Sequence, residues 1–205
     1  MKKTLAVLLI LALLTAGWFF VTRNNLVRLD EGVKAAWSQV ENVYQRRLDL
    51  IPNLVATVQG YASHERETLE AVIKARAQAS QISAGALEGA INDPQSFAKF
   101  QAAQASLSSA LSRLMVVVER YPELKADQNF LQLQSQLEGT ENRITVERQR
   151  FNEAAQTYNT QIRTFPSSMV ASVSGFEARP YFQAQSGAEQ APKVEFRSPE
   201  TQGTR

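Results

Sequence analysis

Two adjacent arginines followed by an aspartate are the residues whose types and spacing could most readily bind a partner. Arg46, Arg47 and Asp49 precede Pro52, which predicts a junction between two helices. Two guanidinium groups at an exposed junction could grip a partner's carboxylates or phosphates. The alternative is structural: the arginines neutralise the C-terminal end of one helix, and Asp49 caps the next. We place six residues in this candidate partner-docking set, all expected at one end of the molecule: Arg46, Arg47, Asp49, Asn53, Tyr121 and Lys125.

A second set of polar residues recurs along the last long helical segment. Asn152 and Asn159 lie seven residues apart, and each directly follows an aromatic residue. Interhelical hydrogen bonds that set the register are predicted for them, because buried asparagines do this in coiled coils. A polar stripe that binds a ligand is the alternative. Glu141 and Arg148 are also seven apart, which is too far for a close pair on one helix, so we expect them to pair with other helices. These four residues form a candidate structural polar network.

Composition argues against most catalytic and metal-based functions. The chain of 205 residues has no cysteine, which excludes disulfides, thiol nucleophiles and Cys-ligated metals. Its single histidine, His64, lacks a partner at metal-ligand spacing, and we expect a solvated or capping role. No Gly-rich phosphate loop or Ser–His–Asp order is present. We therefore predict no enzymatic activity, no catalytic residue, no metal and no cofactor.

An apolar run at the N-terminus predicts a membrane anchor. The charge-free stretch from Leu5 to Val21 follows Lys2 and Lys3, and as a helix it spans about 25 Å. A cleaved signal peptide is the alternative, with a small-residue site at Thr15-Ala16-Gly17. The bulky residues from Trp18 to Val21 suit a membrane interface better than a mature N-terminus.

The charge distribution bears on orientation and on partners. Lys2 and Lys3 favour a cytoplasmic N-terminus and an extracytoplasmic main domain, although Arg23, Arg28 and Lys34 on the other flank weaken that bias. The chain carries 22 basic and 20 acidic residues, a net charge of +2. A balanced domain of this kind lacks the basic surface that binds nucleic acid, so we expect no such partner.

Apolar residues at steps of three and four predict four amphipathic helices after the anchor. The first begins near Asn24, and only Gly17 and Gly32 could separate it from the anchor, so the two can form one continuous rod. Asp49 and Pro52 begin the second helix, which runs to about Gln81. A loop is predicted over 83–94 and a third helix over 95–120. The fourth helix is predicted over residues 127–164. Six apolar residues recur every seven positions along it and directly after it: Phe130, Leu137, Ile144, Phe151, Tyr158 and Phe165.

These elements predict an all-α protein, an up-and-down antiparallel four-helix bundle preceded by one N-terminal transmembrane helix. We divide the chain into an anchor (1–23), a bundle domain (24–183) and a polar tail (184–205) that we expect to be disordered. The two turns far from the membrane should form a distal pole that contains the docking set. Residues 165–182 should lie at the membrane-proximal end, either on the membrane surface or folded back over the open end of the bundle.

The sequence also resembles the LemA family. In the first half the similar segments are Arg46 to Val55, Gly60 to Glu65 and Ala75-Arg76-Ala77. In the second half they are Tyr121 to Lys125, Glu141, Ile144, Arg148, Phe151-Asn152, Tyr158-Asn159 and Phe165-Pro166. Together they cover roughly residues 24–182. Arg23 and Phe151 stand where tyrosine is usual, and the lipidated cysteine of many relatives is absent.

The resemblance implies a membrane-anchored helical bundle of the bacterial envelope and no defined reaction. It also implies a context of envelope stress and membrane organisation, often beside membrane zinc peptidases. Our leading hypothesis is a non-enzymatic scaffold or adaptor in the inner membrane, docking envelope proteins, with a membrane zinc peptidase as one such partner. The alternative is a ligand- or lipid-sensing bundle. The sequence leaves a homo-oligomer open.

Overall fold

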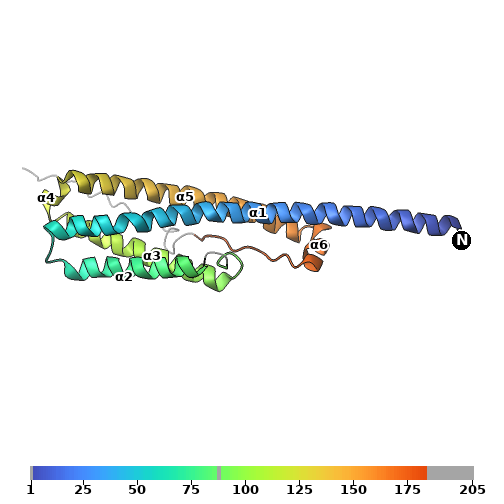
Figure 1. The fold of residues 1–205 in the computed structure, drawn as a ribbon, viewed down its shortest axis with the longest axis horizontal. Coiled ribbons are helices and arrows are strands. Elements are labelled where there is room, and N and C mark those ends of the chain that lie inside the picture. Colours follow the sequence, from blue (N-terminus) through green and yellow to red (C-terminus); the bar gives the residue numbers. More distant parts are fainter. Residues whose placement is uncertain (1, 87–88, 184–205) are drawn as a thin grey trace, which may run out of the picture.

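The protein is an all-α bundle in which one long helix extends far beyond the others (Figure 1). A computed structural model describes residues 2–86 and 89–183, so the predicted disorder of residues 184–205 lies outside the described part. Four helices run alternately up and down, as the sequence predicts. The elements are α1 (Lys2–Tyr61), α2 (Arg66–Ala86), α3 (Pro94–Val118), the single turn α4 (Pro122–Lys125), α5 (Gln128–Arg163) and α6 (Ser167–Ser174).

The anchor and the first bundle helix form one continuous rod. Helix α1 has 60 residues, about 90 Å of helix, and neither Gly17 nor Gly32 interrupts it. Its N-terminal third projects from the bundle with its apolar side chains exposed, whereas Leu26 and later residues on one face are buried. Within the described residues, α1 is the one helix long and apolar enough to cross a membrane. The rod therefore connects a membrane anchor directly to the core.

The predicted helix boundary at Pro52 is wrong, because α1 continues through it to Tyr61. Proline lacks the N–H that would bond the carbonyl of Leu48, four residues earlier, and such a loss usually breaks a helix. Arg76 of α2 compensates, since its Nε donates to that Leu48 carbonyl oxygen at 2.9 Å. The helix also continues because the residues after Pro52 bury an apolar face that includes Leu54 and Val58.

The chain reverses at residues 62–65, so the distal pole is composed differently from the prediction. There the hydroxyl of Tyr61 donates to Asp127 at 3.0 Å, and the hydroxyl of Tyr121 donates to Glu65 at 3.1 Å. Arg120 also pairs with Glu65 at 2.9 Å. These contacts join the α1–α2 turn to the connection between α3 and α5. Of the predicted docking set, Tyr121 and Lys125 belong to this pole.

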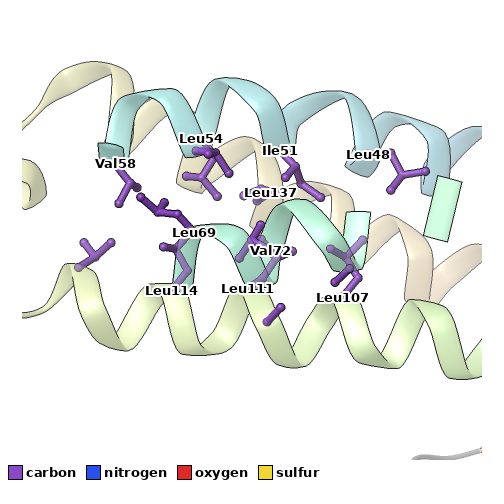
Figure 2. Close-up of a cluster of buried hydrophobic side chains, with 14 of the residues drawn as sticks. Leu48, Ile51, Leu54, Val58, Leu69, Val72, Leu107, Leu111, Leu114 and Leu137 are labelled. Carbon is purple, nitrogen blue, oxygen red and sulfur yellow. The ribbon is translucent and has the colours of Figure 1, made fainter. Parts of the chain in front are cut away.

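The distal half of the bundle has an aliphatic core (Figure 2). Leucine, isoleucine and valine side chains from α1, α2, α3 and α5 meet there, most of them with almost no exposed surface. The labelled members are Leu48, Ile51, Leu54, Val58, Leu69, Val72, Leu107, Leu111, Leu114 and Leu137.

The proximal half, nearer the membrane anchor, has an aromatic core. The Trp37 ring lies with its centroid 5.2 Å from that of Phe100 and 5.5 Å from that of Phe151. Phe182, from the C-terminal part of the chain, lies 4.9 Å from Phe97. These rings fill the part of the bundle that the shorter α2 does not cover.

The seven-residue repeat marks the buried face of α5 up to its last turn. Its first five members, Phe130 to Tyr158, are buried. Phe165 is 76% exposed because α5 ends at Arg163 and the chain turns away. Helix α2 also runs to Ala86, further than predicted, and Asp93 caps α3 by accepting from the backbone N–H groups of Gln95 and Ser96.

Candidate docking groove between α3 and α5

One side of the bundle is open. Helix α1 packs along α5, α2 packs along α3, and α1 contacts α2. In the described residues the backbones of α3 and α5 come close at few positions at most, and these helices meet through buried side chains such as Phe97 and Phe151, whose ring centroids lie 5.9 Å apart. The space between α3 and α5 is a groove of about 840 Å³. A neighbouring hollow of about 640 Å³ shares Ser108, Ser112 and Glu141 with it and extends it toward the distal pole. The groove wall on α3 consists of small and polar side chains, among them Ala98, Gln101, Ala102, Ala105, Ser108, Ser109 and Ser112.

A buried arginine forms the floor of the groove. Arg47 is 1% exposed, and its guanidinium donates to Glu141 of α5 at 2.7 Å and to Ser108 of α3 at 3.0 Å. It also donates to the side-chain oxygen of Gln104. One side chain thus joins three helices across the open side. The predicted exposure of Arg47 is wrong, because residue 47 lies three residues after buried Tyr44 and four before buried Ile51, on the face of α1 that packs into the bundle.

Several polar groups on this floor have unused bonding capacity. Arg47 Nε and Gln104 Nε2 are buried donors without a hydrogen-bond partner in the described part of the chain. Tyr44 lies under the Arg47 guanidinium, 5.1 Å from it to the ring centroid. Burial raises the pKa of Tyr44, opposed by the positive charges of Arg148 and Arg47, so its phenol is neutral. The floor of the groove therefore holds two N–H donors that the described protein groups leave unsatisfied and that have almost no exposed surface.

The proximal end of the groove is closed by an extended segment, residues 176–183, which we call the strap. Asn152 and Asn159 of α5 each hold one strap residue by two hydrogen bonds. The Asn152 amide donates to the Phe182 carbonyl at 3.1 Å, and its oxygen accepts the Phe182 N–H at 2.9 Å. Asn159 makes the same pair of bonds with Arg179, both at 2.8 Å. Each asparagine side chain thus makes the pair of hydrogen bonds, one donated and one accepted, that a residue of a neighbouring strand would make through its backbone.

The spacing of these two clamps follows from helix and strand geometry. Seven residues along α5 advance about 10.5 Å. Three residues of extended chain, from Arg179 to Phe182, advance about 10 Å. Asparagines seven apart on a helix can therefore bind residues three apart on an extended chain. The predicted hydrogen bonds of the asparagines exist, but their partner is the strap and not another helix.

Two arginines hold the strap, one at its C-terminal end and one at its centre. Arg148 donates to the Gln183 carbonyl at 2.9 Å and lies 4.7 Å from the centroid of the Phe182 ring. Arg179 of the strap pairs with Asp30 of α1 at 2.5 Å. Burial would raise the pKa of Asp30, but the hydrogen bonds and charges of Arg179 and Lys34 outweigh it and hold this pKa below its ordinary value. Asp30 is therefore ionised and fastens the strap to the rod.

The remaining predicted docking residues do not gather at one place. Arg46, Asp49 and Asn53 are exposed on the outer face of α1, away from the groove. Asp49 caps no helix and accepts instead from Gln45 at 2.8 Å. At the distal pole, Lys125 is exposed and pairs with Glu119 at 2.6 Å. The structure thus separates a set that the sequence placed together.

The described residues contain no cluster of metal-ligating side chains. Within 2–86 and 89–183, no three His, Cys, Asp or Glu side chains are arranged to hold a metal ion. His64 is exposed in the turn between α1 and α2.

The sequence reasoning missed Gln104 and Ser108 on the groove. It also did not predict the bond from Arg76 to Leu48 or the contacts of Arg179 with Asp30 and Asn159. A sequence signal existed for the groove. Small residues recur along α3 at alternating steps of four and three, at Ala98, Ala102, Ala105, Ser109 and Ser112, so this face of α3 carries no bulky side chain.

Taken together, the long apolar helix and the bundle define a membrane-associated helical protein. The chain belongs to the LemA family, whose model matches residues 36–196. It is 27% identical over 194 residues to magnetosome protein MamQ 2 of Paramagnetospirillum magneticum, an alignment that covers 86% of this chain and 71% of that protein. It is 26% identical over 163 residues to protein LemA of Metamycoplasma hominis, with 78% of this chain and 69% of the relative covered. Neither name states a reaction.

Proposed function

We propose that this protein is a non-enzymatic adaptor of the bacterial envelope that binds another envelope protein in the groove between α3 and α5. The observation that carries the proposal is the open groove of about 840 Å³ between α3 and α5. Its lining includes exposed side chains that can donate hydrogen bonds to a bound segment, among them Ser109, Ser112 and Thr145. A peptide segment supplies one carbonyl acceptor per residue.

The strap indicates which shape of partner the groove suits. The chain already binds an extended segment of its own beside the groove, through Asn152, Asn159 and Arg148. The groove continues from Gln183 toward the distal pole, with Glu141 and Ser108 along its length. We therefore propose an extended peptide segment of an envelope protein as the bound element. The family resemblance favours a membrane zinc peptidase as one such partner.

The rod α1 supports a tethered adaptor over a freely diffusing one. A continuous helix from the anchor to Tyr61 fixes the bundle at a defined height above the bilayer. We propose the inner membrane as its location and an extracytoplasmic position for the bundle. The relatives' names contain no enzymatic activity, which agrees with a structural role.

Photo-crosslinking in living cells tests the groove. A photoreactive amino acid replaces Ser109 or Thr145, two exposed residues that line the groove, in the full-length chain. Matched positions at the previously predicted docking sites are Asn53 on the outer face of α1 and Lys125 at the distal pole. The proposal predicts one defined crosslinked protein from Ser109 and Thr145. Crosslinks from Asn53 or Lys125 with none from the groove would contradict it.

A second candidate is a sensor of a small anionic ligand. The observation that favours it is that two guanidinium groups, those of Arg47 and Arg148, line the same groove. Titration of the full chain in nanodiscs with inorganic phosphate and with dicarboxylates distinguishes the two functions. A rise in melting temperature that Arg148→Gln abolishes supports the sensor, and no change at millimolar ligand excludes these ligands.

A further inference from the structure

The membrane-proximal end of the bundle carries a short helix at the level where the membrane anchor ends. Helix α5 runs toward this end, and the strap runs away from it, because successive strap residues bond Asn159 and then Asn152. Helix α6 is the reversal between them. Phe19 of α1 and Phe176, just after α6, both pack against the core cluster that contains Val170. Figure 1 accordingly shows α6 beside the part of α1 where the apolar run ends.

The two faces of this reversal differ sharply in burial. Val170 and Ala171 are 1% and 2% exposed and pack onto the bundle. On the outer face, three large apolar side chains lie four residues apart and are exposed: Phe165 by 76%, Met169 by 61% and Val173 by 79%. A contiguous apolar stripe of this kind on a small domain marks an interaction surface.

Its position identifies a lipid surface as the partner. Helix α6 packs against α1, and the exposed apolar side chains on either side of Phe19 include Trp18, which is 43% exposed, and Phe20, which is 63% exposed. Arg23 of α1 and Arg163, the last residue of α5, are exposed beside the stripe. Aromatic rings with flanking cations are typical of the interfacial zone, where rings lie at headgroup depth and guanidinium groups meet phosphates.

We propose that α6 lies in the headgroup region of the bilayer and turns Phe165, Met169 and Val173 into the lipid. The two alternatives predicted for residues 165–182, the membrane surface and the open end of the bundle, thus apply to different parts of this segment. The part from Phe165 to Val173 contacts the membrane, and the strap folds back, with Phe182 in the aromatic core. A second membrane contact beside α1 limits the tilt of the rod and points the distal pole away from the bilayer. This inference rests on the anchorage of α1 and is independent of the docking groove.

The absence of native cysteine allows a direct test with single spin labels. Met169→Cys and Val173→Cys are labelled in the full chain and reconstituted in nanodiscs of phosphatidylcholine and phosphatidylglycerol. Gln156→Cys, an exposed site on α5 further from the anchor, is the matched control. Accessibility to oxygen, which concentrates in lipid, is compared with accessibility to a water-soluble nickel chelate. Circular dichroism melts verify that each labelled protein is folded.

We expect the oxygen-to-nickel accessibility ratio at Met169 and Val173 to exceed that at Gln156 several-fold. A ratio equal to that of Gln156 at both positions overturns the proposal. Protection from both reagents, with dipolar broadening between Val173 labels, also overturns it and assigns the stripe to contact between two copies of the chain. The labels are remote from Ser109 and Thr145, so this result is separable from the crosslinking test of the groove.

Discussion

The hydrogen bond from Arg76 to the Leu48 carbonyl explains how α1 passes through Pro52, and it can be tested by a double-mutant cycle. The carbonyl belongs to a residue that is 1% exposed, so water cannot replace the donor. Arg76→Met retains the apolar stem and removes the donor. Leaving a buried carbonyl unsatisfied costs about 1–3 kcal/mol. We therefore expect Arg76→Met to lower the free energy of unfolding by about 2 kcal/mol.

The second arm of the cycle restores the missing backbone donor. Pro52→Ala supplies an N–H to the same Leu48 oxygen and by itself should stabilise α1, because an interior proline costs a helix about 3 kcal/mol. In that background Arg76→Met should cost at least about 1 kcal/mol less than it does with Pro52. Urea unfolding of the full chain in mild detergent, followed by circular dichroism, measures all four proteins. Arg143→Met on the exposed face of α5 is the control and should change stability by less than about 0.5 kcal/mol.

Equal costs of Arg76→Met in the two backgrounds would refute this reasoning. They would mean that Arg76 stabilises the bundle through its packing alone and that the helix tolerates the free carbonyl.

Three further predictions concern the proximal core and the strap. Phe151→Ala should destabilise the bundle by about 3–5 kcal/mol in urea unfolding, because the ring is fully buried among aromatic neighbours; a change within error would contradict that packing. Asn159→Ala should cost about 1–3 kcal/mol and increase amide exchange at Arg179, whereas unchanged exchange would mean that the clamp does not hold the strap. The pKa of Asp30 lies below its ordinary value of 3.8, so its stabilisation is complete above that pH and is lost as the pH falls through the lower folded-state pKa. Asp30→Asn should therefore reduce the loss of stability between pH 4 and pH 2, measured by thermal melts, and an unchanged acid slope would contradict the Asp30–Arg179 pairing.

Local periodicity explains why the long helices could be predicted from the sequence. The apolar stripe from Leu26 to Tyr44 and the seven-residue repeat of α5 each place apolar side chains on one face of a helix, and that face is buried. Such a pattern is visible in residues that lie close together in the sequence. The same rules failed at Pro52. The compensating donor, Arg76, lies 28 residues from Leu48 on another helix, so no local pattern shows it.

The position of the strap could not be predicted from sequence periodicity, for a different reason. An extended segment held by side chains needs neither a 3.6-residue nor a two-residue repeat, and residues 176–183 show neither. The asparagines that bind it were identifiable as a pair seven apart, but the identity of their partner depends on where the chain returns after α6. Similarly, the prediction that Arg47 lies at an exposed pole depends on a reversal of the chain at Pro52. The chain reverses instead after Tyr61.

The most direct test of the proposed adaptor function combines the Ser109 photo-crosslink with a variant that fills the groove. Ala105→Trp places a bulky ring on the exposed α3 wall, and Ala56→Trp on the outer face of α1 is the matched control. The proposal predicts that Ala105→Trp abolishes the defined Ser109 crosslink, that Ala56→Trp leaves it intact, and that both variants melt like the parent protein. A Ser109 crosslink that persists at full yield in the Ala105→Trp protein would contradict docking in the groove.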